Sequence, residues 1–239
     1  MAARDRKSAS DADLAPLFGR EWKSLSYREV LVELIRLGWT PCGVGDMAVA
    51  LRSPRGLLAA RVCPFDPAHP PFVELCRSCS GNPYLPRIDL AVVLNGGGAL
   101  TVMEFLAPAG PTVAAEVSRR WREGGGDSDF DAVRREALAV DAECRACVPW
   151  WDGIDLNDGN VRRSVDGAVT LVDLFCLDGP ALYGQILQDA DVVRRQLPED
   201  QRRHVLHIPY LARESSPDEL QALRFAWAES EAREPGPAV

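Results

Sequence analysis

Long hydrophobic runs are absent from the 239-residue sequence. No stretch approaches the ~20 consecutive apolar residues that a membrane-spanning helix needs. Residues 1–8 carry charge, but no apolar segment follows them, so the sequence shows no signal peptide. These absences predict a cytoplasmic protein without a membrane partner, and secretion as an effector stays open as an alternative.

Positive charge is also in short supply. The chain has 27 Lys and Arg against 35 Asp and Glu, which gives a net charge of −8. This balance argues against a general nucleic-acid binder, because such proteins need cationic groups to meet phosphates. The sequence has no internal repeat, which excludes solenoids and collagen. Its 46% hydrophobic and 26% charged residues are typical of a globular protein.

The elements predicted along the chain indicate an α+β protein with two lobes. Residues 1–13 are polar and are expected to form a flexible N-terminus. A single domain should then cover residues 14–232, with a β-rich lobe over about 26–106 and a shortened helical lobe over about 112–232. Periodicity and turn signals predict helices over 27–37, 70–79, 113–123, 129–147 and from 216 onward, and strands within 39–63, 88–94, 99–106 and 168–175.

The segment from Asp155 to Asp173 carries the most informative chemical pattern. Asp155 begins the pattern D-L-x-x-x-N, which ends at Asn160, and Asp173 follows after a predicted strand. Phosphoryl transfer needs a carboxylate that orients the proton of the attacking hydroxyl. It also needs oxygen ligands for Mg²⁺, and one amide together with one carboxylate suits that ion. A β-hairpin whose Asp and Asn residues only stabilise turns is the alternative interpretation.

Upstream segments match this pattern in the order found in protein kinases. Residues 43–48 resemble the glycine-rich loop G-x-G-x-x-G, with alanine at the third glycine, and lie between two predicted strands. Residues 59–62 stand where the kinase strand A-x-K is expected, and Glu74 follows on a predicted helix. Residues 102–106 look like the strand that enters an interlobe hinge. The chain thus resembles the protein-kinase-like family, including its compact bacterial and phage members and pseudokinases.

The resemblance implies a role for each of these residues. Asp155 would be the catalytic residue, and Asn160 and Asp173 would bind Mg²⁺. A second set would contact ATP: glycines over the phosphates, an arginine that anchors them and pairs with the helix glutamate, and two hinge residues. This set comprises Gly43, Gly45, Arg61, Glu74, Glu104 and Leu106.

Three departures from the kinase pattern bear on function. Arg61 stands in place of the lysine, and arginine is wider, planar and bidentate. Gly153 and Ile154 replace the His-Arg pair before the catalytic aspartate, so control through a phosphorylated activation loop is not expected. Asp173-Leu-Phe replaces D-F-G and no A-P-E follows, which reduces the platform that docks peptide substrates.

The predicted function is therefore ATP- and Mg²⁺-dependent phosphoryl transfer to a protein Ser/Thr or to a small molecule. A pseudokinase that binds a nucleotide or a partner with little turnover is the first alternative, and Arg61 favours it. An unrelated α+β interaction module is the second. Nucleotide-dependent stabilisation would separate the last from the other two.

Cysteine spacing raises a separate possibility. Two C-x-x-C pairs have the half-site spacing of tetrahedral zinc, and they comprise Cys76, Cys79, Cys144 and Cys147. Because both pairs fall in predicted helices, buried reduced thiols are the competing interpretation. The three histidines, His69, His204 and His207, have no matched partner in the sequence and are expected on the surface or in packing roles.

Overall fold

The computed structural model describes residues 3–233 and has the two-lobed α+β architecture expected from the sequence. The first lobe is built on an antiparallel five-stranded sheet with the strand order β1-β2-β3-β5-β4. Every predicted strand of this lobe is present. The strands are β1 (Thr40–Val44), β2 (Val49–Arg52), β3 (Leu58–Cys63), β4 (Ile88–Val93) and β5 (Ala99–Glu104).

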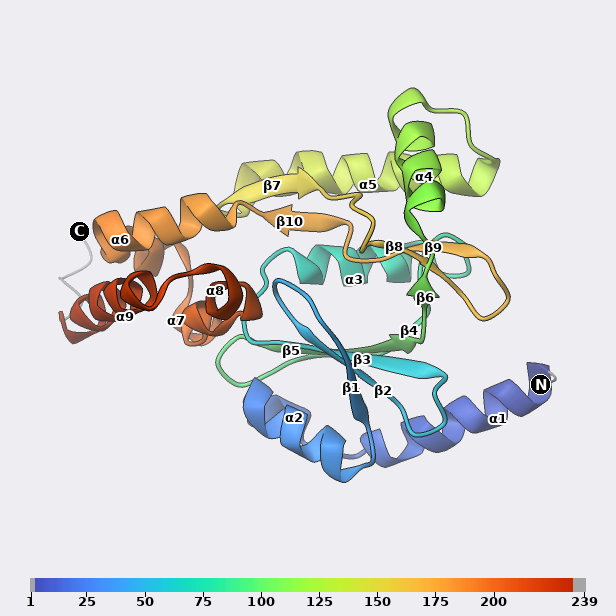
Figure 1. Ribbon diagram of the computed structural model, residues 1–239, viewed down its shortest axis with the longest axis horizontal. Coiled ribbons are helices and arrows are strands. Elements are labelled where there is room, and N and C mark those ends of the chain that lie inside the picture. The colour runs from blue at the N-terminus through green and yellow to red at the C-terminus, as the bar shows by residue number, and fades with distance from the viewer. Residues whose placement is uncertain (1–2, 234–239) are drawn as a thin grey trace.

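Helices cover both faces of this sheet (Figure 1). On one face lie α1 (Ala3–Leu14) and α2 (Tyr27–Arg36), and the capping box predicted for α2 from Ser26 and Glu29 is present. On the other face lies α3 (His69–Ser78), between the sheet and the second lobe. Helix α1 stands where the sequence suggested a flexible segment. Its end is tied to the β2–β3 turn, because the buried Asp13 carboxylate pairs with the Arg55 side chain and accepts its backbone N–H.

The second lobe begins after the hinge with a short strand and two predicted helices, β6 (Ala107–Pro108), α4 (Pro111–Glu123) and α5 (Ser128–Cys147). Two small antiparallel pairings follow. In one, β7 (Trp151–Ile154) pairs with β10 (Phe175–Leu177); in the other, β8 (Val161–Arg163) pairs with β9 (Val169–Leu171) and β6.

The chain ends in a helical region of which the sequence indicated only the last helix. It contains α6 (Gly179–Gln196), α7 (Glu199–Arg202), α8 (Pro209–Glu214) and α9 (Pro217–Ala232), and α9 has the predicted capping box from Ser216 and Glu219. Short 3₁₀ turns lie at Ala15–Leu17, Trp22–Ser24 and Val205–His207. No helix in the described range is both long and apolar enough to cross a bilayer.

A buried cluster under α3 supports the loops that carry the candidate site. Phe72 and Leu75 of α3 pack with Phe130 of α5, and Leu171 and Leu174 from around β9 complete this core. All five side chains are almost fully buried. Because close-packed interiors resist displacement, this core fixes the position of the loops on either side of β8 and β9 relative to the five-stranded sheet.

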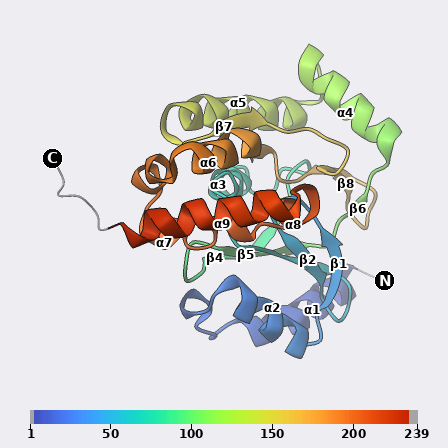
Figure 2. The same cartoon turned by 60° about the vertical axis from the view of Figure 1, so that its left-hand side comes forward.

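Residues 199–214 form a second connection between the lobes, which we call the strap. Tyr210 in α8 donates its backbone N–H to the Asp46 carbonyl at 2.8 Å, and Arg213 forms an ion pair with the Asp46 carboxylate. Arg203 donates to the side-chain oxygen of Asn95 at 3.0 Å. The turns β1–β2 and β4–β5 are therefore both attached to the second lobe, as Figure 2 shows for α8 beside β1 and β2.

Candidate active site

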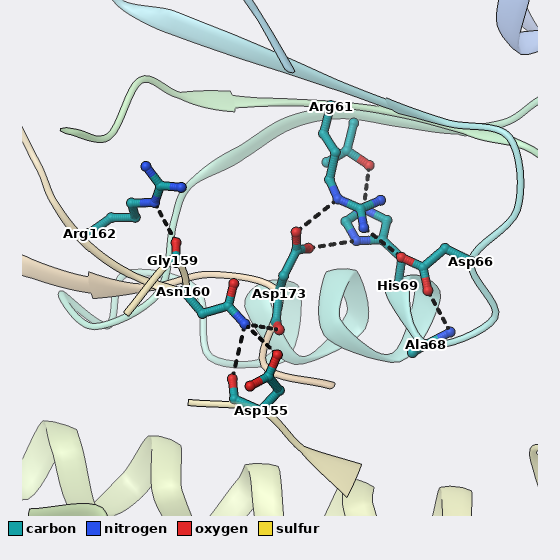
Figure 3. Close-up of polar contacts among 10 residues, drawn as sticks. Arg61, Asp66, Ala68, His69, Asp155, Gly159, Asn160, Arg162 and Asp173 are labelled. Carbon is teal, nitrogen blue, oxygen red and sulfur yellow. Dashed lines mark hydrogen bonds and ion pairs between the residues drawn. The ribbon is translucent and has the colours of Figure 1, made fainter. Parts of the chain in front are cut away.

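The loop between β7 and β8 brings Asp155, Asn160 and Asp173 together (Figure 3). The Asn160 side-chain amide donates to the Asp155 carbonyl, to the Asp155 carboxylate and to the Asp173 carbonyl, each at 3.1 Å. Asn157 donates to the same carboxylate through its side chain at 2.7 Å and its backbone at 3.2 Å. One asparagine thus links the two aspartates that the sequence placed in one site.

Asp155 lies half-buried at the end of β7. Its backbone N–H donates to the Leu174 carbonyl at 2.8 Å, which joins the strand end to the segment that follows β9. Burial raises the pKa of the Asp155 carboxyl, and this outweighs the opposing hydrogen bonds from Asn157 and Asn160. A raised pKa makes a carboxylate a better proton acceptor near neutral pH.

Asp173 carries its charge between two cationic or proton-donating side chains. Its Oδ2 lies 3.0 Å from Nε of Arg61, and its Oδ1 lies 3.3 Å from Nδ1 of His69. Burial opposes ionisation, but Arg61 and His69 together hold the pKa of Asp173 well below its usual range. The residue has a left-handed backbone with φ of 45°, which is uncommon for a residue other than glycine.

Arg61 in β3 is 9% exposed and has two carboxylate partners. Besides Asp173, its Nη2 contacts Oδ2 of Asp66 at 2.5 Å, and Asp66 also accepts the backbone N–H of Ala68 at 3.1 Å just before α3. The third guanidinium nitrogen, Nη1, is buried without a hydrogen-bond partner in the described chain. The arginine therefore keeps one set of donors unused inside the site.

The predicted pairing of Glu74 with Arg61 does not form in the structure. Glu74 is exposed on α3, because the buried stripe of that helix runs through His69, Phe72, Val73 and Cys76. This stripe follows i, i+3, i+4 and i+7 spacing, and Glu74 lies off it. Asp66, which lies before the helix, supplies the counter-charge instead.

Two residues of the site escaped the sequence interpretation. Asp66 lies in the short connection between β3 and α3, and His69 is the first residue of α3. No motif marks either residue, and His69 was expected on the surface or in packing. Its ring is instead buried against Asp173 and Thr101. The only available signal was spacing: Asp66 comes five residues after Arg61 and three residues before the start of a helix with prolines in its first turn.

Gly43 and Gly45 lie in the β1–β2 hairpin, at the edge of the sheet. Gly43 pairs with Ala50, and the Gly45 N–H donates to the Ala48 carbonyl at 2.9 Å, which closes the turn. The next residue, Asp46, is the one held by the strap. The hairpin is therefore a fixed turn with an exposed outer edge.

The predicted hinge residues lie at the end of β5, the strand that bears Thr101: Glu104 is its last residue and Leu106 follows. The Glu104 carboxylate accepts the Arg87 backbone N–H at 3.2 Å, and Leu106 is buried. Between them, the Phe105 N–H donates to the Leu57 carbonyl at 2.8 Å. A hollow of about 810 Å³ lies at this end of the sheet, and Glu104 and Phe105 line it.

Asn160 and Asp173 offer a donor set that fits Mg²⁺. Three hydrogen bonds from the Asn160 nitrogen fix the orientation of the amide. Its oxygen has no hydrogen-bond partner within residues 3–233 and is therefore free to bind a metal ion. Each oxygen of Asp173 keeps a second acceptor direction beside its contact with Arg61 or His69. Mg²⁺ typically takes one or two protein oxygen ligands and completes its shell with phosphates and water.

The four cysteines do not form a metal centre in the described part of the chain, where no cluster of three or more His, Cys, Asp or Glu side chains could hold a metal ion. Cys76 and Cys144 are buried in the core between α3 and α5, and Cys147 is exposed. Burial raises the pKa of the Cys144 thiol and, still more, that of Cys76. Their environment favours protonated thiols over metal-binding thiolates.

Comparison with known proteins finds similarity only at the level of the fold. No known family profile and no curated protein sequence matches the chain. Aminoglycoside phosphotransferase APH(3″)-Id from Streptomyces rimosus is 14% identical, with 86% of this chain and 98% of that chain aligned and a TM-score of 0.34. A GDP complex of a mutant aminoglycoside 2′-phosphotransferase-IIIa is 10% identical, with 87% and 98% aligned and a TM-score of 0.36. Both likenesses are to kinase-like phosphotransferases and are too distant to assign an activity.

Proposed function

We propose that the protein is an ATP- and Mg²⁺-dependent phosphotransferase. The observation that carries the proposal is the hydrogen-bonded unit of Asp155, Asn160 and Asp173, which faces the buried Arg61 across the lobes. A pair of turn-stabilising residues would not require a buried arginine on the opposite lobe. Here a proton acceptor, an amide oxygen, a carboxylate and a guanidinium meet in one place.

The chain's own residues divide the work of transfer. Asp155 takes the proton of the acceptor hydroxyl as that oxygen bonds to the γ-phosphorus and the bond to the leaving ADP oxygen breaks. Asn160 and Asp173 would hold Mg²⁺, which when bound neutralises charge on the phosphates. Arg61 holds Asp173 in place and offers its unused Nη1 to an incoming phosphate oxygen.

Gly43, Gly45 and the hinge residues Glu104 and Leu106 complete the proposed nucleotide site. Glycines at the hairpin leave the backbone open to phosphates, and the backbone at 104–106 would meet the base. The acceptor is a protein Ser/Thr or a small molecule. The helical lobe after Asp173 is short, so it offers only a small surface on which a protein substrate could dock.

A nucleotide-binding pseudokinase is the second candidate. The observation that favours it is the double engagement of Arg61, whose Nε and Nη2 already serve Asp173 and Asp66. A guanidinium that is held in this way is less free to turn toward a phosphate than an unpaired lysine would be. Transfer of radiolabelled phosphate from ATP, including to water, separates the two candidates.

Melting curves with and without ATP and Mg²⁺ test the site itself. We expect wild type to be stabilised by the combination and Asp173→Ala to lose that stabilisation, because a charged metal ligand is gone. Asp158→Ala is the matched control, since Asp158 is an exposed carboxylate in the neighbouring β7–β8 loop. Equal nucleotide-dependent shifts in wild type and Asp173→Ala would refute the assignment.

A further inference from the structure

His69 joins the sheet to the proposed metal ligand. It is the first residue of α3 and is 3% exposed. Its Nε2 lies 2.8 Å from the Thr101 hydroxyl in β5, and its Nδ1 lies 3.3 Å from Oδ1 of Asp173. Figure 3 shows the His69 ring beside Arg61, with the Asp173 carboxylate facing it.

The Thr101 hydroxyl determines which ring nitrogen carries the proton. Thr101 is 1% exposed, and its hydroxyl has no hydrogen-bond partner other than His69 among the described residues. A buried hydroxyl that cannot donate its proton costs free energy, so Nε2 must be the acceptor. The ring proton then resides on Nδ1.

The opposite tautomer would fail at both ends. With the proton on Nε2, the lone pair of Nδ1 would face the Asp173 carboxylate at 3.3 Å, and the Thr101 proton would have no acceptor. Of the two tautomers, the Nδ1–H ring is the one that satisfies both neighbours.

We infer that His69 is a positioning residue, whose Nδ1–H faces Asp173 and, with Arg61, limits the direction of that carboxylate. The buried Nδ1 makes no hydrogen bond among the described residues, and Oδ1 of Asp173 at 3.3 Å is the anionic atom that it faces. Arg61 contacts Oδ2 on the other side, so rotation of the carboxylate about its own axis would disturb both contacts. The inference rests on the proposed function, because it is the Mg²⁺ site that would benefit from a fixed carboxylate.

The Mg²⁺ requirement of nucleotide binding tests this role. Melting shifts are measured at saturating ATP over a series of Mg²⁺ concentrations, for wild type, His69→Leu, His69→Asn and Thr101→Val. Leucine fills the space without a donor, whereas the asparagine amide nitrogen can replace Nδ1–H. We expect the midpoint for Mg²⁺ to rise roughly 10–100-fold in His69→Leu, the usual effect of losing a partner that orients a metal ligand. It should stay near wild type in His69→Asn and rise in the isosteric Thr101→Val.

A purely structural role would lower the melting temperature of the unliganded variants and leave the Mg²⁺ midpoint unchanged, which overturns the inference while the proposed function stands. If wild type shows no shift with ATP and Mg²⁺, the proposed function fails and the inference fails with it. Should His69→Leu not fold, Thr101→Val against a Thr101→Ser control gives the same comparison.

Imidazole ¹⁵N chemical shifts of the full chain without ligand give a second readout. The sequence has three histidines, so loss of one signal set in His69→Asn assigns His69. The Nδ1–H tautomer at a fixed, mildly alkaline pH supports the inference. The Nε2–H tautomer overturns it.

Discussion

Replacing Asp66 with asparagine should destabilise the protein, although Asp66 lies outside the catalytic loop. The Asp66 and Arg61 side chains are 6% and 10% exposed and lie 2.5 Å apart. Asparagine keeps the shape of the side chain and can still accept the Ala68 N–H, so the substitution chiefly removes charge. Loss of one partner from a buried pair costs roughly 3–5 kcal/mol when the other charge is left uncompensated. Because Arg61 keeps Asp173, we expect the free energy of unfolding to fall by about half of that, on the order of 2 kcal/mol.

Glu74→Gln provides the matched control, because it makes the same change of charge on the exposed face of α3. We expect its free energy of unfolding to stay within about 0.5 kcal/mol of wild type, as for most surface substitutions. Urea unfolding followed by tryptophan fluorescence measures both variants. In thermal melts, each kcal/mol corresponds to about 2–4 °C for a chain of this size.

A double variant sharpens the comparison. Asp66→Asn combined with Asp173→Asn leaves Arg61 buried without a carboxylate. The double variant should therefore lose more free energy of unfolding than the two single variants added together, by roughly 0.5–3 kcal/mol. The reasoning is refuted if Glu74→Gln destabilises as much as Asp66→Asn. It is also refuted if the loss in the double variant equals the sum of the two single losses, because the reasoning has each aspartate compensate for loss of the other.

Three further predictions concern chemistry, pH and the strap. Asp155→Asn should keep nucleotide binding and lower phosphate transfer by roughly 10²–10⁴-fold. A variant that transfers phosphate at the wild-type rate would show that Asp155 is only a loop carboxylate. Burial, His207 and Arg203 lower the pKa of His204 from 6.5 to about 4, so stability should fall as the pH drops through this window, because the unfolded chain binds the proton more tightly. His204→Gln should flatten that part of a urea-unfolding series, and an unchanged slope would contradict the assignment. Asp46→Ala should accelerate hydrogen exchange at the Tyr210 amide with little loss of stability, since the ion pair to Arg213 is exposed; unaltered exchange would show that the strap does not depend on this pair.

Elements with local signals were predictable from the sequence. The capping boxes at Ser26 and Ser216 begin α2 and α9 as expected, and both satisfy backbone donors with side chains three residues away. The glycine-rich connection at 95–98 joins β4 to β5 as a hairpin. Such features depend on neighbouring residues alone, so no knowledge of tertiary contacts was needed.

Contacts between distant residues were harder to infer. The D-L-x-x-x-N spacing indicated that Asp155, Asn160 and Asp173 meet, because a short loop and a hairpin leave little freedom between them. The partner of Arg61 was predicted to be Glu74 and is Asp66. The prediction failed because the rotation of α3 about its axis is set by which of its side chains pack into the core. The region of α6 to α8 was missed because its apolar positions pack against one another and against Phe65, with no regular stripe over a long segment.

An arginine at position 61 suits the two carboxylates that it contacts. A lysine places its three donors on one compact nitrogen, whereas the guanidinium presents Nε and Nη2 on different edges of a rigid plane. Arg61 uses these edges to join Asp173 of the second lobe to Asp66 of the first. Asp66 lies before α3, on a connection five residues from Arg61, so the position of this counter-charge does not depend on how α3 is rotated about its axis.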